Sequence, residues 1–254
     1  MAALSTRTSG PTGVPRLVLV HGFTQSARCW SPIDDALAAD HEVVGVDAPG
    51  HGGSSAVSAS FDEAVDLLAA AGGRGTYLGY SMGGRLALAA AIAHPEVVER
   101  LVLIGASPGL ADPDERATRI AADEALADHV EAVGVDAFLD EWLALPLFAG
   151  LHPAAAHLDE RRRNTAAGLA DSLRRCGTGA QPPQWDRLGE LGARGLPVLL
   201  VVGEHDAKFR AIAEAMADGI GPTAAVAVVP GAGHTAHLEQ PAAFLAAVRP
   251  FLSP

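Results

Sequence analysis

The chain has little lysine, few cysteines and no long apolar run, and each shortage excludes a class of protein. Of the 18 basic residues Lys208 is the only lysine, and with 30 acidic residues the net charge is -12. Such a chain lacks the basic stripe that a nucleic-acid surface needs, so we expect no nucleic-acid partner. No apolar stretch reaches membrane-spanning length without a glycine, a proline or a charge, so we expect no membrane insertion.

The two cysteines, Cys29 and Cys176, lie far apart in the sequence. Neither has the spacing of a metal-binding or redox motif, which favours idle thiols in a reducing compartment. The polar residues 1–15 contain no apolar stretch of the kind found in signal peptides. We therefore predict a cytoplasmic protein without a metal site.

The composition, 49% hydrophobic and 19% charged, is typical of a globular chain. Short continuous apolar runs, as expected for strands buried on both faces, alternate with helical stretches. The predicted strands are residues 16–20, 42–46, 75–79, 101–104, 198–202 and 224–229. The predicted helices are residues 27–39, 61–71, 83–93, 209–217 and 241–252. This alternation predicts an α/β fold with a mostly parallel sheet covered by helices on both faces.

The alternation fails between residues 107 and 186, where helical patterns occur without a clear strand. This stretch is too long for a loop, so a helical insertion is the economical interpretation. We therefore predict a core of residues 1–106 and 187–254 with a helical cap subdomain at 107–186.

A nucleophile motif follows the third predicted strand. Residues 79–83 have the pattern G-x-S-x-G with Ser81 at the centre, and a helical stretch follows them. Glycines on either side of the serine allow a strained turn, and the turn exposes the hydroxyl at the N-terminus of a helix. We therefore predict that Ser81 is a catalytic residue.

A catalytic serine needs a base, and the base needs an acid that orients it. Asp206 and His234 each follow a predicted strand, in the chain order expected after such a serine. Both would therefore lie at the edge of the sheet where Ser81 also lies. The competing acids are Glu204, early in its loop, and Asp47, which precedes the serine.

The competing histidines are His205 and His237, and for His237 we expect a solvated or helix-capping role. An oxyanion hole requires two backbone N–H groups. The candidates are Met82, directly after the serine, and Phe23, in the loop after the first predicted strand. Gly22 would let the backbone of that loop come close.

The segments HGF at residues 21–23, DAPGHGGS at 47–54 and GYSMGG at 79–84 resemble the α/β-hydrolase superfamily. A second set of segments resembles, more narrowly, the 2-succinyl-6-hydroxy-2,4-cyclohexadiene-1-carboxylate synthases of the menaquinone pathway. These segments, together with Trp185, are residues 79–85, 106–110, 145–148, 172–174, 177–182, 206–209 and 233–241. One departure is the short polar chain before residue 16, which leaves little room for the antiparallel strands that often begin this fold.

The narrower resemblance implies a lyase that needs no metal or organic cofactor. In that family a proton is abstracted at the succinyl arm of a cyclohexene carboxylate, and pyruvate leaves without consumption of water. The resemblance implies Ser81 as the proton acceptor, backed by His234. The oxyanion hole would stabilise the developing enolate.

The substrate implied by the resemblance is a small molecule with three carboxylates, which an acidic protein would bind only through a local cationic patch. Arg85 lies four residues after Ser81, so it can face the same cleft. The resemblance implies further substrate contacts from Arg119 and Trp142 of the cap and from Tyr80. Of the run 161–163, we favour Arg163 as the residue that faces the pocket.

Two other functions remain open. A serine esterase or carbon–carbon bond hydrolase of the same fold would use the same triad, but a hydrophobic ester needs neither Arg85 nor Arg119. A non-catalytic ligand receptor is the third hypothesis, and an intact triad with both oxyanion loops speaks against it. The sequence specifies no oligomeric state.

Overall fold

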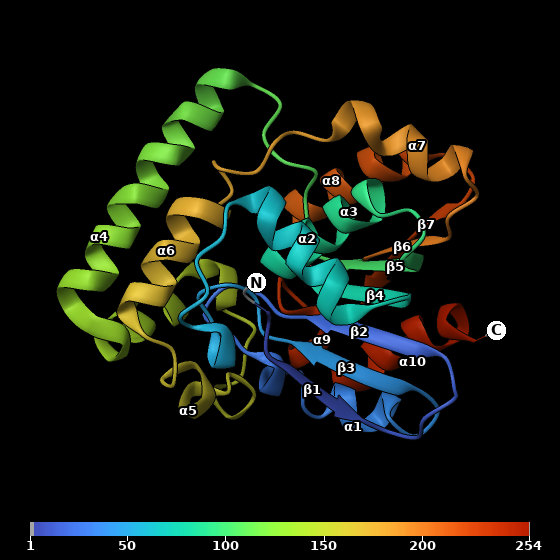
Figure 1. Ribbon diagram of the computed structural model, residues 1–254, viewed down its shortest axis with the longest axis horizontal. Coiled ribbons are helices and arrows are strands. Elements are labelled where there is room, and N and C mark those ends of the chain that lie inside the picture. Colours follow the sequence, from blue (N-terminus) through green and yellow to red (C-terminus); the bar gives the residue numbers. More distant parts are fainter. Residues whose placement is uncertain (1–2, 254) are drawn as a thin grey trace.

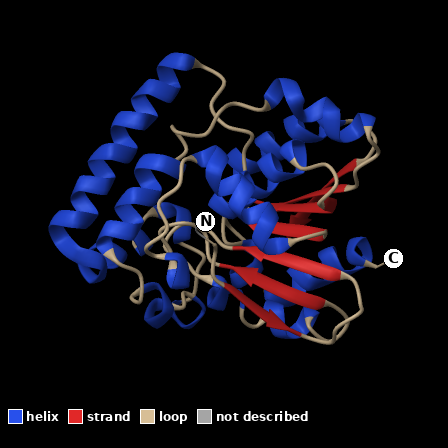
Figure 2. Ribbon diagram, in the orientation of Figure 1, coloured by secondary structure: helices blue, strands red, loops and turns tan. Residues whose placement is uncertain are grey.

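The computed structural model describes residues 3–253 and contains a sheet of seven strands flanked by helices (Figures 1 and 2). The strand order is β1-β3-β2-β4-β5-β6-β7, and every neighbouring pair except β1 and β3 is parallel. The strands are β1 (Thr6–Ser9), β2 (Arg16–Val20), β3 (Glu42–Val46), β4 (Gly75–Tyr80), β5 (Val98–Ile104), β6 (Val198–Gly203) and β7 (Ala224–Val229).

All six predicted strands are therefore confirmed, with ends that differ by three residues at most. The seventh, β1, occupies the polar N-terminal stretch in which we expected little room for an antiparallel strand. It pairs antiparallel with β3 through the register Thr6 to Val46 and Ser9 to Val43. Its first three residues are exposed, so this edge strand is held by its backbone ladder and has no apolar pattern by which it could be predicted.

Helices cover both faces of the sheet, as predicted. On one face lie α2 (Phe61–Gly72), α3 (Met82–Ala93), α7 (Leu188–Ala193) and α8 (Ala207–Ile220), which share one apolar core with the strands. The other face carries α1 (Ile33–Leu37), α9 (Ala236–Glu239) and α10 (Pro241–Leu252), with a second core that includes Trp30. The sheet is thus buried on both sides, which explains its continuous apolar strands.

The predicted helix at residues 27–39 is wrong as a single element. A 3₁₀ helix (Ala27–Trp30) is followed by Ser31 and Pro32, and α1 begins only at Ile33. Proline has no N–H to donate and disfavours a helical residue before it, so the chain cannot continue as one helix through this point. The apolar periodicity of the sequence concealed the interruption.

Between β5 and β6 the described chain contains helices and no strand. The longest are α4 (Pro113–Leu143) and α6 (Ala166–Cys176), which lie side by side although 22 residues of chain separate them (Figure 1). Between them come the short helix α5 (Leu158–Arg161) and two 3₁₀ turns, Pro146–Phe148 and Pro153–Ala155. We call residues 113–176 the helical segment.

The helical segment is held together partly by apolar contact and partly by charge. Ala127, Val130 and Phe138 of α4 pack against Leu169 and Leu173 of α6. The guanidinium of Arg174 also pairs with three carboxylates of α4, those of Glu124, Asp128 and Glu131, at 2.7 to 2.9 Å. None of the helices in residues 3–253 combines the length and apolarity required to span a membrane.

Candidate active site

The turn between β4 and α3 places Ser81 at the carboxyl edge of the sheet. Ser81 has φ 50° and ψ -109°, a backbone conformation that L-residues rarely adopt. The flanking glycines make the turn possible, because a Cβ on Gly79 would lie 2.5 Å from the carbonyl oxygen of Gly83. A Cβ on Gly83 would lie 2.2 Å from the carbonyl oxygen of Val20. The predicted strand–turn–helix context of the motif is therefore confirmed.

Three residues from separate loops converge at this turn. The Nδ1 atom of His234 lies 2.7 Å from Oδ2 of Asp206, and its Nε2 atom lies 3.3 Å from Oγ of Ser81. The side chains of His234 and Asp206 are almost wholly buried, with exposed fractions of 3% and 8%. This is the geometry in which a carboxylate orients an imidazole and the imidazole accepts a proton from a hydroxyl.

The surroundings of His234 hold its ring in place. Gly105 has φ 54°, and a Cβ there would lie 2.8 Å from Cε1 of the imidazole. The Phe209 ring also packs against the imidazole, with its centroid 4.6 Å from that of His234. The amide of Phe209 also donates to Oδ1 of Asp206, which fixes the second carboxylate oxygen.

Glu239 is a supporting residue that the sequence analysis did not single out. Its carboxylate accepts hydrogen bonds from the amides of Gly233 (2.6 Å) and Thr235 (3.0 Å), on either side of His234. The Thr235 hydroxyl donates to the same carboxylate at 2.6 Å. One side chain thus clamps the loop that carries the histidine. The only sequence signal was its place in the segment 233–241.

The competing acids have other partners. Asp47 accepts from the amides of Ala27 and Gly53, and Glu204 accepts from the amide of Gly231. Cys176 lines the cavity beside the serine, but burial raises the pKa of its thiol to about 12 and keeps it protonated. Within residues 3–253 no group of three or more His, Cys, Asp or Glu side chains is placed to hold a metal ion.

The expectation for His237 is wrong. This side chain is 1% exposed and packs between Trp30 and Tyr80, with ring centroids at 4.9 and 4.6 Å. Burial and the nearby charge of His234 lower the pKa of His237 to about 3, so the ring is neutral. The competing His205 is exposed.

The two amides predicted for the oxyanion hole face no acceptor of the protein. Within residues 3–253 the N–H groups of Phe23 and Met82 donate no hydrogen bond, whereas the amides of Gly22 and Thr24 do. Phe23 and Met82 both line the cavity that contains Ser81 and His234. A Cβ on Gly22 would lie 2.6 Å from the ring of Tyr80, so only glycine permits this close approach.

Two chambers meet at Ser81. The triad chamber, about 260 Å³, contains the serine, His234, Asp206 and both oxyanion candidates, and its far wall includes Trp142 of α4. The outer chamber, about 410 Å³, is lined by the loop after β5, by the start of α4 and by α8. Six residues line both chambers: Ser81, Arg85, Arg119, Thr178, Lys208 and Phe209.

All the lysine and arginine side chains that line these chambers lie on the shared wall. Arg85 is buried and donates to the carbonyl oxygen of Gly177 at 3.3 Å, with Oε1 of Gln181 at 3.5 Å. Burial lowers the pKa of Arg85 to about 10, but the guanidinium remains charged at neutral pH. Arg119 pairs with Asp123 at 2.7 Å, and Lys208 lies with its ammonium 5.7 Å from the centre of the Phe209 ring.

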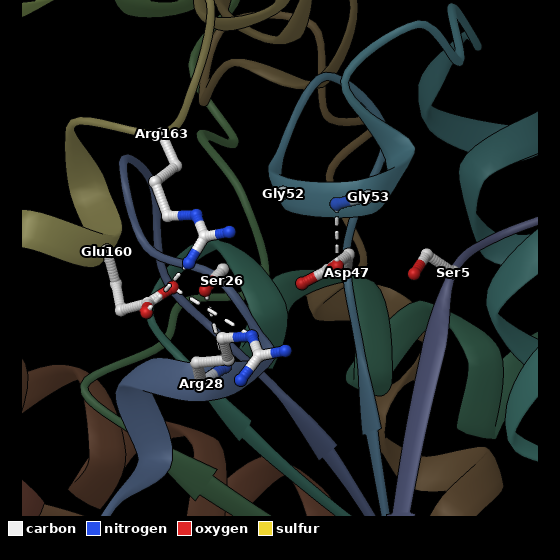
Figure 3. Close-up of a pocket in the computed structure, with 8 residues that line it drawn as sticks. All are labelled: Ser5, Ser26, Arg28, Asp47, Gly52, Gly53, Glu160 and Arg163. Atoms are coloured by element: carbon white, nitrogen blue, oxygen red, sulfur yellow. Dashed lines mark hydrogen bonds and ion pairs between the residues drawn. The ribbon is translucent and has the colours of Figure 1, made fainter.

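The structure does not bring Arg163 to this cavity. Its side chain is 67% exposed, pairs with Glu160 at 3.4 Å and lines a separate pocket of about 310 Å³ (Figure 3). Arg28 approaches the other side of the same Glu160 carboxylate, at 4.0 Å. The sequence could not show which of the three arginines faces the cavity. They lie at the end of the four-residue helix α5, which is too short to have a repeating apolar face.

Arg161, two residues earlier, is the member of the run that points inward. It is 1% exposed, donates through Nε to the carbonyl oxygen of Ala156 at 2.7 Å and donates through NH1 to the hydroxyl of Thr24. Its NH2 group is buried without a hydrogen-bond partner in the described chain. Tyr80, which is also buried and does not line either chamber, lies within the electrostatic influence of this guanidinium.

Several known proteins are similar to this chain over nearly its whole length. The family model described as "Alpha/beta hydrolase family" matches residues 17–248. A protein of Escherichia coli O1:K1 / APEC named 2-succinyl-6-hydroxy-2,4-cyclohexadiene-1-carboxylate synthase is 34% identical over 256 residues, which cover 96% of each chain. A Bacillus subtilis (strain 168) protein named as a candidate for the same synthase is 37% identical, covering 96% of this chain and 92% of that protein.

Among solved structures, MenH from S. aureus matches with a TM-score of 0.87 and 30% sequence identity. The match covers 99% of this chain and 98% of that one. The agreement therefore extends over the core and the helical segment alike. The chain belongs to the alpha/beta hydrolase family and, within it, to the family of the 2-succinyl-6-hydroxy-2,4-cyclohexadiene-1-carboxylate synthases.

Proposed function

We propose that this protein is a lyase of menaquinone biosynthesis that eliminates pyruvate from 2-succinyl-5-enolpyruvyl-6-hydroxy-3-cyclohexene-1-carboxylate. The product of the related synthases has ring double bonds at positions 2 and 4. The proton that is lost is therefore the one on ring carbon 2, beside the succinyl carbonyl. The electron pair of that C–H bond becomes a new ring double bond, the old one shifts, and the bond from ring carbon 5 to oxygen breaks.

In this proposal Ser81 and His234 act together as the base. The hydroxyl accepts the proton from ring carbon 2 as its own proton passes to Nε2 of His234, and Asp206 stabilises the resulting imidazolium. Negative charge then develops on the succinyl carbonyl oxygen. The free amides of Phe23 and Met82 are suited to stabilise it, as in acyl transfer.

The leaving group departs as the enolate of pyruvate. The enolate takes a proton from solvent at its terminal carbon and becomes pyruvate. The proton held by the base returns to solvent, so atoms and charge balance without consumption of water. This return restores Ser81 and His234 to their starting protonation states. The reaction as written needs no group beyond the protein and its substrate.

The main support for a lyase comes from the arginine side chains beside the triad. A substrate with three carboxylates needs positive charge within reach of the reacting atoms, and Arg85 and Arg119 supply it on the same wall as Ser81. Arg161 is a further candidate, because an unpartnered buried NH2 group is costly unless a ligand completes it. We propose Trp142, which lines the triad chamber, as a further part of the substrate site, within a cap at residues 107–186. Tyr80 lines neither chamber, so its predicted substrate contact finds no support here.

A hydrolase of the same fold is the second candidate, and the intact triad favours it. The decisive assay offers purified protein the enolpyruvyl cyclohexene substrate and measures pyruvate, with a short p-nitrophenyl ester in a parallel reaction. We expect pyruvate release that is lost in a Ser81→Ala variant. Brisk ester hydrolysis with no pyruvate above background would reject the lyase and support the hydrolase.

A further inference from the structure

We propose that the outer chamber binds the carboxylate of the leaving enolpyruvyl group and that Lys208 is the residue that holds it. This inference rests on the proposed lyase function and adds to it a separate subsite for pyruvate. Lys208 would be a positioning residue for the leaving group, whereas the base remains in the triad chamber.

The chemistry of the substrate requires two regions of binding space. The succinyl group is on ring carbon 2 and the enolpyruvyl group on ring carbon 5, and these positions are opposite each other across a six-membered ring. When carbon 2 faces the base, the enolpyruvyl group must therefore extend away from it. A single compact pocket around the triad would leave this group without contacts.

The two chambers provide these two regions. His234, Asp206, Phe23 and Met82 line only the triad chamber, so the carbon that loses its proton must lie there. Ser81 lies on the shared wall, so a ring beside it can extend into the outer chamber. The outer chamber is therefore the region that the opposite end of the ring can enter.

Lys208 differs from the other two cations of the shared wall because its charge is uncommitted. Arg119 already pairs with Asp123, and Arg85 is directed at the carbonyl oxygen of Gly177. The ammonium of Lys208, a residue that lines the outer chamber, forms no ion pair within residues 3–253 and lies over the Phe209 ring. A flexible ammonium of this kind can bind a carboxylate and follow it as the bond to the ring breaks.

The charges of the outer chamber also favour release. Asp112 and Glu115 line this chamber and are absent from the triad chamber, whereas the cations lie on the wall that both share. An anion held at Lys208 is thus attracted by the cations of the shared wall and repelled by the two carboxylates of the outer chamber. Weak binding is what a product subsite needs, because tight binding of free pyruvate would slow turnover.

Four proteins test the inference: wild type, Lys208→Met, Lys208→Arg and Arg210→Met. Arg210 lies on the same helix, lines neither chamber and donates to the backbone of Glu204, so its substitution is a matched control for loss of one positive charge. Binding of ¹³C-labelled pyruvate is titrated by NMR for each protein, independently of turnover. Pyruvate release from the full substrate is measured in parallel.

We expect Lys208→Met to raise the Kd of pyruvate about 10-fold, the order of effect for loss of a charge-assisted contact at a partly exposed site. Lys208→Arg should restore most of the affinity, and Arg210→Met should bind pyruvate as wild type does. A KM for the full substrate that rises in Lys208→Met alone would support the same conclusion.

The outcomes separate this inference from the proposed function. Suppose that wild type releases pyruvate, but that all four proteins bind pyruvate equally well or that none of them binds it. The subsite is then wrong and the lyase stands. If wild type releases no pyruvate yet binds it through Lys208, the lyase is wrong, and Lys208 binds a small carboxylate that is not a leaving group. Failure of both measurements overturns both.

Discussion

The two walls of the triad chamber are built by different means. The core wall consists of Ser81, Asp206 and His234, which each follow a strand and are held by hydrogen bonds of 2.7 to 3.3 Å. Close glycine contacts also fix the turn at Ser81 and the ring of His234. The opposite wall is the helical segment, where Arg119 and Trp142 reach the chamber from α4. That helix is tied to α6 by exposed ion pairs and a small apolar cluster.

This difference in construction matches the different tasks proposed for the two walls, proton transfer at the core wall and substrate contact at the helical wall. Proton transfer depends on atom positions to within a fraction of an ångström, so it suits the wall whose backbone leaves no freedom. Exposed ion pairs contribute little to stability and are weakened by salt, so the helical wall is the easier of the two to displace. In the proposed function, the same helical wall supplies Arg119 and Trp142 as substrate contacts.

The largest expected effect is on the core wall. Ser81→Ala should lower kcat for pyruvate release about 10²- to 10⁴-fold, the usual contribution of a positioned general base. Ser172→Ala is the matched control, because Ser172 lines the same chamber from α6 and, within residues 3–253, its hydroxyl forms a single hydrogen bond, to the sulfur of Met82 at 3.6 Å. Equal losses in the two variants would remove the distinction between the walls. Circular dichroism establishes that both proteins are folded.

Sequence reasoning located the core wall because backbone geometry carries a local signal. A G-x-S-x-G between a strand and a helix needs only neighbouring residues to specify its turn, and a residue after a parallel strand must lie at the common edge. Ser81, Asp206 and His234 therefore come together where their strands predict. Glu239 escaped notice since its role depends on two amides of a loop whose shape the sequence does not specify.

The helical wall and the N-terminal edge were harder to predict for a physical reason. Which of residues 161–163 points inward depends on the angle at which one short turn docks on the core, and this angle follows from tertiary packing alone. Similarly, β1 has no apolar pattern, and the interruption at Pro32 outweighs the periodicity around it. Apolar patterns thus predict elements buried on the sheet, whereas docking of short exposed elements needs the full structure.

An intermediate effect should distinguish Arg85, which lines both chambers, from Arg163, which lines neither. Arg85→Met should lower kcat/KM by about 10- to 100-fold, corresponding to about 1.5–3 kcal/mol for a hydrogen bond to a charged group. Arg163→Met removes the same charge from the separate pocket of Figure 3 and should leave kcat/KM unchanged. Steady-state kinetics over a range of substrate concentrations measures both. A comparable loss in Arg163→Met would place that residue in the substrate site after all.

The smallest effect concerns the free energy of unfolding. It tests whether the packing beneath the core wall requires His237 to be neutral. His237 lies under Tyr80 with a pKa lowered from 6.5 to about 3, so the unfolded chain binds a proton there before the folded protein does. The stability that this residue contributes is therefore complete above pH 6.5 and is lost progressively as the pH falls toward 3.

Replacing the imidazole removes that dependence. Between pH 7 and pH 5 the free energy of unfolding should fall about 2 kcal/mol less in His237→Phe than in wild type, from the proton linkage of one such group. Urea unfolding at the two pH values measures this difference, and any packing cost of phenylalanine cancels because it is present at both. His205→Phe, at an exposed position, is the control and should keep the wild-type dependence. An identical pH dependence in wild type and His237→Phe would mean that His237 binds protons equally in the folded and unfolded states. The core wall would then not require a neutral ring at this position.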